Sequence, residues 1–185
     1  FNKMQGWKDK IVLNLIKGIE FLCKKNNVSV VKGNASFESS NKLRVSDGKD
    51  VSYINFHKAI IAVGSKPVEL QNFKFDGKKV ISSTDALYLD KIPKNLVIIG
   101  GGYIGLELGT VYAKLGSKVS IVEMEQQILP GFDRDIVEVL EKNLEKLGVE
   151  IYIDSKIEKF ENGKAIVDSK RGGRISLDAD NLLVT

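Results

Sequence analysis

The stretch that decides the fold is Leu96-Val97-Ile98-Ile99-Gly100-Gly101-Gly102-Tyr103-Ile104-Gly105-Leu106-Glu107-Leu108-Gly109. It begins as an apolar strand and passes through a glycine-rich turn into the start of a helix. Gly100 permits the tight turn, Gly102 lets the backbone approach a phosphate without a Cβ atom, and Gly105 lets the helix pack closely on the strand. Because the first N–H groups of a helix have no partner within it, they face the anion. The stretch therefore predicts a site for the pyrophosphate of a dinucleotide.

The residues that follow complete a βαβ unit around this turn. The helix continues through Tyr112 to Leu115 and stops at Gly116, and the apolar run Lys118 to Val122 predicts a second strand that ends at Glu123. Glu123 lies about 20 residues beyond the glycines, where a carboxylate accepts hydrogen bonds from both adenosine ribose hydroxyls of NAD and repels a 2′-phosphate. No Arg follows closely enough to bind such a phosphate. The pattern favours NAD over NADP, and the alternative is a purely structural turn beside a solvated glutamate.

Before the glycine turn, the sequence predicts one long helix and a series of short strands. Apolar residues recur at helical spacing over residues 8 to 25, which predicts an amphipathic helix. Turn signals such as Ser46-Asp47-Gly48 separate the strand-like runs that follow. These runs are Val28 to Val31, Ala35 to Phe37, Lys42 to Val45, Val51 to Ile54 and Ala59 to Val63. Together they predict a small antiparallel meander that ends in a buried strand.

Residues 64 to 94 contain Pro67 and Pro93 and show little periodicity, which indicates a crossing between two domains. Within it, Ser83 or Thr84 is a candidate cap for a short helical turn at Asp85 to Leu89.

Beyond the βαβ unit, Arg134 to Leu147 predicts a helix that ends at Gly148, a good left-handed cap position, and Val149 to Ile153 predicts the next strand. Further strand candidates are Lys156 to Phe160, Lys164 to Asp168, Arg174 to Leu177 and Asn181 to Thr185. The predicted fold class is α/β, with a Rossmann-like parallel sheet that carries an added β-meander and is preceded by a helix and a second β-meander.

Composition excludes several classes of function. The 28 Lys and Arg residues exceed the 24 Asp and Glu residues by only four, and the basic side chains form no dense block, so nucleic acid binding is not indicated. No apolar run approaches the roughly 20 residues that span a bilayer. Cys23 is the only cysteine and is expected to be a buried thiol in a helix. With one His and one Cys, a metal site is unsupported. The chain begins at Phe1 and not at Met, and we expect it to be part of a larger protein.

Three groups of residues leave alternatives open. Tyr103 and Glu107 are spaced four apart and share one helix face, either beside the nicotinamide or as a core tyrosine and a solvated glutamate. The apolar neighbours of Glu107 predict its partial burial beside a cation. The run Ile60 to Pro67 is either a simple strand exit or a turn close to a second ligand. His57, the only histidine, has no triad partners around it and is expected to be an ordinary strand residue.

Spaced motifs along the chain resemble one family. They are Ala62-Val63-Gly64-Ser65-Lys66-Pro67, Ser82-Ser83-Thr84-Asp85-Ala86-Leu87, Ile92-Pro93 and Gly100 to Glu107. Together they resemble the flavin-dependent pyridine nucleotide disulfide oxidoreductases and, within that family, most resemble the dihydrolipoamide dehydrogenases. The resemblance covers essentially the whole chain and implies two dinucleotide-binding domains, one for FAD and one for NAD, followed by a central region and a dimer-forming domain. It implies that residues 1–66 are the C-terminal portion of the FAD domain, 67–94 a crossing and 95–185 the NAD domain.

The resemblance also implies which residues contact each cofactor. Those expected at NAD are Gly100, Gly101, Gly102, Tyr103, Ile104, Gly105, Leu106, Glu107, Glu123 and Ile157, with Ile157 against the adenine. Those expected at FAD are Ala35, Val63, Gly64 and Ser65. Tyr103 matches a residue able to gate the nicotinamide pocket, and Glu107 matches one that pairs with a lysine beside the flavin, which would lie upstream of Phe1.

The implied function is oxidation of protein-bound dihydrolipoamide with hydride transfer from FAD to NAD. The chain departs from the family pattern because the FAD-binding GxGxxG, the redox-active CxxxxC and the catalytic His-Glu pair are missing. We therefore expect no catalytic residue in this chain and no turnover by it alone. Implied partners are the lipoyl domains of 2-oxo acid dehydrogenase complexes and a second copy of the protein, in the cytoplasm or a mitochondrial matrix. Alternatives are a transhydrogenase, an NADH oxidase or a mercuric reductase on the same scaffold, or a non-catalytic NAD-binding module.

Overall fold

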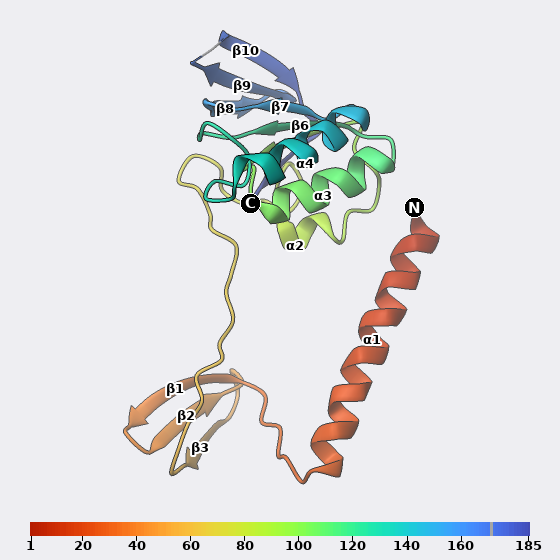
Figure 1. Ribbon diagram of the computed structural model, residues 1–185. Helices are drawn as coiled ribbons and strands as arrows, with labels where there is room; N and C mark the ends of the chain where they lie inside the picture. The colour runs from red at the N-terminus through yellow and green to blue at the C-terminus, as the bar shows by residue number, and fades with distance from the viewer. Residues whose placement is uncertain (171) are drawn as a thin grey trace. The chain divides into compact units, whose positions relative to one another are not determined.

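The computed structural model describes residues 1–170 and 172–185, which form two compact units (Figure 1). The first unit comprises Asn2–Ser65 and the second Lys66–Thr185. The glycine-rich turn belongs to the second unit.

The first unit consists of one helix and a three-stranded antiparallel sheet. Helix α1 spans Asn2–Lys25, and strands β1 (Asn34–Ser39), β2 (Lys42–Ser46) and β3 (Val51–Asn55) pair in the order β1-β2-β3. The Ser46-Asp47-Gly48 turn is stabilised by the Asp47 carboxylate, which accepts hydrogen bonds from the backbone N–H groups of Lys49 and Asp50. These bonds favour the ionised form and lower the pKa of Asp47. The predicted helix and three of the predicted strands are thus confirmed, with α1 starting earlier than residue 8.

Two of the predicted strands in this unit are wrong. Residues 28 to 31 and 59 to 63 lie outside the described strands. The second run was expected to be buried, yet Ile60 is 94% exposed and Val63 is 88% exposed. An apolar run forms a strand only where a neighbouring edge offers backbone partners, and β-propensity alone does not supply them. The predicted burial of Cys23 is also incomplete, because every residue of α1 keeps some exposure and Cys23 is intermediate.

A five-stranded parallel sheet forms the centre of the second unit. Its order is β4-β11-β5-β6-β7, and all four neighbouring pairs run parallel. The strands are β4 (Val80–Ser82), β5 (Asn95–Ile99), β6 (Lys118–Val122), β7 (Glu150–Tyr152) and β11 (Asn181–Val184). The helices are α2 (Ser83–Ala86), α3 (Tyr103–Lys114) and α4 (Arg134–Lys146). The predicted βαβ unit is confirmed.

Glycine ends two of these helices as the sequence predicts. Gly116 follows α3 with φ +97° and Gly148 follows α4 with φ +75°, in the left-handed region that glycine adopts without strain. Helix α2 starts earlier than the sequence predicted, because Ser82 is its cap. The Ser82 and Asp85 side chains each bond the other residue's backbone N–H in a capping box. Strand β4 was not predicted at all.

The sheet is buried on both faces, which explains its nearly continuous apolar strands. Along β5, Leu96 and Ile98 face the cluster that includes residues of α2, α3 and α4, whereas Val97 faces a second cluster under the meander. Figure 1 shows the three helices on one side of this unit and the meander strands on the other. The meander consists of β8 (Ser155–Glu161), β9 (Lys164–Ser169) and β10 (Gly173–Asp178), paired antiparallel in the order β10-β9-β8. This layering agrees with the predicted α/β class.

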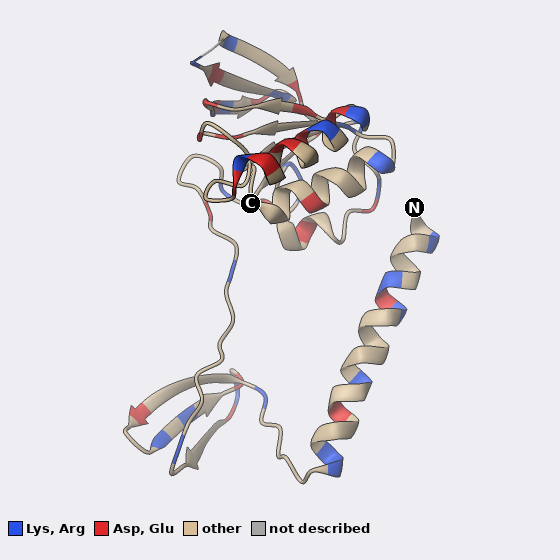
Figure 2. Cartoon of the chain, viewed as in Figure 1, with Lys and Arg blue, Asp and Glu red and all other residues tan. Residues whose placement is uncertain are grey.

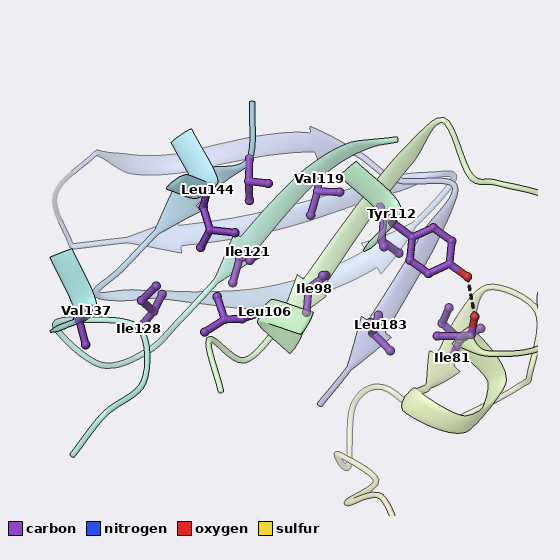
Figure 3. Packing of buried hydrophobic residues seen from close by; sticks show 13 residues of the cluster. Ile81, Ile98, Leu106, Tyr112, Val119, Ile121, Ile128, Val137, Leu144 and Leu183 are labelled. Atoms are coloured by element: carbon purple, nitrogen blue, oxygen red, sulfur yellow. Dashed lines mark hydrogen bonds between the residues drawn. The ribbon is translucent and has the colours of Figure 1, made fainter. Parts of the chain in front are cut away.

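Tyr112 anchors α3 within the helix-side core (Figure 3). The residue is 3% exposed, and its hydroxyl donates a hydrogen bond to the carbonyl of Ala86 at the end of α2. Burial disfavours the phenolate and raises the pKa of Tyr112 to about 12. The tyrosine therefore joins α2 to α3 with its polar group satisfied.

Both basic and acidic residues occur along α4 (Figure 2). Arg134 at its start forms a bidentate pair with Glu141 and a second pair with Glu138. In the described part of the chain, no helix is long and apolar enough to cross a membrane.

Candidate functional site

The glycine-rich turn lies where the strand order of the parallel sheet reverses. From β5 the chain proceeds to β6 and β7 on one side, whereas β11 and β4 lie on the other. In open parallel sheets, the crevice at the carboxyl ends of the strands beside such a reversal is where ligands bind. The turn follows the carboxyl end of β5. There the Gly100 N–H donates a hydrogen bond to the carbonyl of Val122 at the end of β6.

Gly100 and Gly105 are required by the backbone itself. Gly100 has φ +105°, and a Cβ there would lie 2.7 Å from the carbonyl oxygen of Thr185. A Cβ on Gly105 would lie 2.5 Å from the carbonyl oxygen of Gly100 and 2.8 Å from the Thr185 hydroxyl. Such distances are closer than real Cβ contacts, so neither position accepts a side chain without a shift of backbone. The predicted tight turn and close packing of helix on strand are confirmed.

Gly102 differs from the other two glycines of the motif. It is the N-cap of α3 with φ −74°, and a Cβ there would meet no atom of the described residues within 4 Å. Leu106 makes the first helical bond, from its N–H to the Gly102 carbonyl. The N–H groups of Tyr103, Ile104 and Gly105 therefore precede the helical ladder and are the donors that a helix start offers to an anion. The open side of Gly102 gives an anion room to approach them.

The Glu123 carboxylate is held under the turn by two backbone donors. Its Oε2 accepts a hydrogen bond from the Gly101 N–H at 2.7 Å, and its Oε1 accepts one from the Glu125 N–H at 2.8 Å. The residue is 9% exposed. Two ionised oxygens can accept about four hydrogen bonds in total, so acceptor capacity remains after these two. The structure thus brings Glu123 to the glycine turn as the sequence predicts.

Three further residues shape the turn and were missed by sequence reasoning. The Leu129 N–H bonds the Gly101 carbonyl at 2.8 Å, with Leu129 in the left-handed region at φ +49°. Ile128 is fully buried, and its side chain would lie 2.9 Å from a Cβ on Gly101. Thr185 follows β11 and contacts the turn from the opposite side. No motif marks these residues, since they reach the turn from other segments of the chain.

Tyr103 and Glu107 lie on the same wall of a hollow beside α3, as their spacing predicts. The hollow has a volume of 570 Å³ and is lined by Tyr103, Leu106, Glu107, Thr110, Val111, Leu129 and Leu140. The predicted partial burial of Glu107 is wrong in this unit, because its side chain is exposed on the outer face of α3. Leu106 is 4% exposed and also packs in the helix-side core.

The remaining residue expected at NAD, Ile157, has a core position. It is 8% exposed and packs with the cluster between the sheet and the meander. Its contact with an adenine stays a prediction. A surface hollow of 180 Å³ is lined by Met124, Asp154, Ser155, Lys156, Asp168 and Lys170, and Ile157 is not among them. Met124 directly follows Glu123 in the chain, and the Ser155 N–H donates to the Glu123 carbonyl, so two residues that line this hollow lie next to the glutamate.

The residues expected at FAD belong to the first unit. Ala35 lies on β1 opposite Val45 of β2. Val63, Gly64 and Ser65 lie on an exposed segment outside the described strands, and Gly64 has φ +67°. Their contact with a flavin stays a prediction. Among the residues that the structure describes, no three His, Cys, Asp or Glu side chains gather in a metal-binding arrangement.

The family model for pyridine nucleotide-disulphide oxidoreductases matches residues 2–185. The chain belongs to this family. Dihydrolipoyl dehydrogenases are among its similar relatives: the protein from Geobacillus stearothermophilus is 44% identical over 188 residues, and that from Bacillus subtilis is 43% identical over 189 residues. Each alignment covers 100% of this chain and 40% of the relative. The chain thus spans about two fifths of the length of these relatives.

Solved structures agree with the fold. The HOCl-induced flavoprotein disulfide reductase RclA from Escherichia coli, in its Cu(II) complex, aligns with a TM-score of 0.80 and 30% identity over 96% of this chain and 41% of that one. LpdA from Mycobacterium tuberculosis aligns with a TM-score of 0.78 over 94% of this chain and 40% of that one. At 20% identity, the second match bears on the fold alone. FAD and NAD are the cofactors of pyridine nucleotide-disulphide oxidoreductases and dihydrolipoyl dehydrogenases, as the sequence resemblance implied.

Proposed function

We propose that this chain is the NAD-binding portion of a flavoprotein that oxidises protein-bound dihydrolipoamide to lipoamide, with hydride transfer from FAD to NAD. The observation that carries the proposal is the 43–44% identity to dihydrolipoyl dehydrogenases over the full length of the chain. The glycine turn and Glu123 support it, because they supply the groups that a dinucleotide requires at the place where this sheet offers a crevice.

The residues at the turn fit the charge and shape of NAD. The pyrophosphate approaches the open side of Gly102 and meets the free N–H groups at the start of α3, whose dipole favours an anion. The Glu123 carboxylate accepts from the adenosine ribose hydroxyls with the capacity left over from Gly101 and Glu125. A 2′-phosphate in the same place would bring like charges together, so NAD is the proposed nucleotide and not NADP.

Beyond the pyrophosphate, Tyr103 and Glu107 line the hollow along α3 that we assign to the nicotinamide end. When bound, the flavin and the nicotinamide supply the hydride chemistry, and the residues of this chain bind and orient. Tyr103 is exposed and free of the core, which suits a side chain that covers and uncovers the pocket. Glu107 is exposed on the same helix face and available to a cation from another part of the protein.

The disulfide step requires sulfur atoms that this chain does not hold. Cys23 is its single cysteine, and thiol–disulfide exchange with a substrate dithiol needs a second sulfur. We therefore propose that the redox-active cysteines and the catalytic base belong to other residues of the full-length protein, and that this chain alone does not turn over. The proposed partners are lipoyl domains of 2-oxo acid dehydrogenase complexes and a second copy of the protein, and the proposed location is the cytoplasm or a mitochondrial matrix.

The test is a steady-state assay of the full-length protein with dihydrolipoamide and NAD. We expect NADH to form, and NADP to be a poor replacement at equal concentration. Activity only with NADPH and a different disulfide would contradict both the substrate and the nucleotide.

A second candidate is another flavoprotein disulfide reductase, which the 30% identity and TM-score of 0.80 to RclA favour. Such an enzyme would reduce an added disulfide with NADH faster than it oxidises dihydrolipoamide. A third candidate is a non-catalytic NAD-binding module. It would bind NADH in calorimetry, and the full-length protein would neither oxidise dihydrolipoamide nor reduce a disulfide.

A further inference from the structure

Thr185 makes two kinds of hydrogen bond to the end of β5. Its backbone N–H bonds the Ile99 carbonyl at 3.0 Å, which continues the parallel pairing of β11 with β5. Its hydroxyl donates to the same carbonyl at 3.1 Å and lies 3.4 Å from the carbonyl oxygen of Gly100. The backbone bond already satisfies the sheet register, so the hydroxyl is a second connection, made to the last residue of β5 and to the first glycine of the turn.

The same hydroxyl lies close to both Gly100 in the turn and Gly105 in α3. It lies 3.0 Å from the position of a Cβ on Gly100 and 2.8 Å from that of a Cβ on Gly105. The hydroxyl therefore occupies space that side chains on Gly100 and Gly105 would otherwise fill. A methyl group in its place would have no attraction to the carbonyl oxygens and would lie too close to the Ile99 carbonyl oxygen, which is 3.1 Å from the hydroxyl.

From the other side, β6 supplies the matching contact. The Glu123 carboxylate accepts from the Gly101 N–H at 2.7 Å, one residue along the turn from Gly100. The residues that follow the strands on both sides of β5 therefore hold the turn: Thr185 bonds the carbonyls of Ile99 and Gly100, and Glu123 bonds the Gly101 N–H. The two contacts fix both ends of the Gly100–Gly101 segment, and the N–H groups that start α3 follow directly from it.

We propose that the Thr185 hydroxyl is a positioning group for dinucleotide binding: it holds the glycine turn in the conformation that keeps the start of α3 open to the pyrophosphate. This inference rests on the proposed function, because it concerns the same NAD site. Thr185 bonds the backbone at Ile99 and Gly100, so its proposed effect on the nucleotide passes through the backbone of the turn.

The experiment uses the FAD-loaded full-length protein and measures the dissociation constant for NADH by calorimetry. Thr185→Val removes the hydroxyl at nearly constant volume, Thr185→Ala removes it and leaves space, and Thr185→Ser keeps it. Ser117→Ala is the matched control, because the Ser117 hydroxyl also donates to a backbone carbonyl, that of Pro93. This bond lies before the amino ends of β5 and β6, away from the glycine turn. Hydrogen exchange of the turn amides without nucleotide is measured on the same variants.

We expect Thr185→Val and Thr185→Ala to weaken NADH binding about 5- to 10-fold, the loss that one neutral hydrogen bond represents. Exchange at residues 100 to 105 rises, the Michaelis constant for NAD rises with it, and kcat stays close to that of the unchanged protein. Thr185→Ser restores the affinity, and Ser117→Ala leaves it unchanged even if it lowers the unfolding temperature.

Unchanged NADH affinity in both Thr185→Val and Thr185→Ala overturns the positioning role and leaves the proposed function standing. Weakened binding in Ser117→Ala to the same degree also overturns it, because the effect would then follow general stability. Failure of the unchanged protein to bind NADH overturns the proposed function itself.

Discussion

The Glu123 carboxylate lies 2.7 Å from the backbone nitrogen of Gly101, 22 positions earlier in the chain, and accepts its hydrogen bond. The glutamate therefore has two roles at once: it fixes the glycine turn and presents charge at the end of β6. A substitution at this position therefore removes a hydrogen bond to the backbone of the turn as well as any contact with a ribose.

Glu123→Ala is expected to weaken NADH binding by about 2 kcal/mol, roughly 30-fold, because it removes a charged acceptor and leaves the Gly101 N–H without it. Glu123→Gln keeps one acceptor oxygen and is expected to lose less. Calorimetry of NADH with the FAD-loaded full-length protein measures both. An unchanged affinity in Glu123→Ala would remove the residue from the site.

Gly102→Ala is expected to separate binding from stability. The added Cβ meets no atom of the described residues within 4 Å, and φ of −74° suits alanine, so the unfolding temperature should change little. The methyl group would occupy the space through which a pyrophosphate approaches, and NADH affinity should fall more than 10-fold, about 1.4 kcal/mol or more. Equal NADH affinity in the variant and the unchanged protein would mean that no phosphate approaches Gly102.

Gly105→Ala is the matched opposite case. Its Cβ would lie 2.5 Å from the Gly100 carbonyl oxygen, so α3 must move away from the end of β5. We expect a loss of about 1–3 kcal/mol in the free energy of unfolding, as for other overpacked sites. Urea unfolding of the full-length protein without nucleotide measures it. If Gly105→Ala were as stable as Gly102→Ala, the close approach of helix and strand would be wrong.

Tyr112 predicts a dependence of stability on alkaline pH. Below pH 10 both folded and unfolded states keep the phenol proton. Between pH 10 and the folded pKa of about 12, the unfolded chain releases the proton while the folded chain retains it, so the free energy of unfolding falls as pH rises. The full loss from this group is about 2–3 kcal/mol.

Tyr112→Phe removes this contribution and also deprives the Ala86 carbonyl of its donor. At pH 8 we expect the variant to be about 1–3 kcal/mol less stable than the unchanged protein. The gap should then narrow between pH 10 and 12, as measured by urea unfolding across that range. A gap that stays constant to pH 12 would contradict the assigned proton release.

Much of the second unit was predictable because its signals are local. The apolar run of β5, the glycines and the periodicity of α4 up to Gly148 each specify an element from neighbouring residues alone. The glycine roles were also predictable, since a tight turn and a close helix approach leave few other residues possible. The position of Glu123 at the turn followed from the same βαβ geometry.

Other features depend on partners far away in the chain. Val80–Ser82 forms β4 because β11, about 100 residues later, offers it a parallel edge at Leu182. The run at residues 59 to 63 has a stronger apolar signal and forms no strand, since the described edges of its unit leave it unpaired.

By itself, the sequence determined the α/β layout, the glycine turn and the glutamate that follows it, because spacing and residue type fix local backbone geometry. Only the tertiary structure decided which strands pair, that Glu107 is exposed, and that Thr185 and Leu129 hold the turn. The physical reason is that hydrogen bonds and burial between distant segments depend on the order of strands in the sheet. The strand order in turn depends on which sheet edges and apolar faces other segments of the chain can cover.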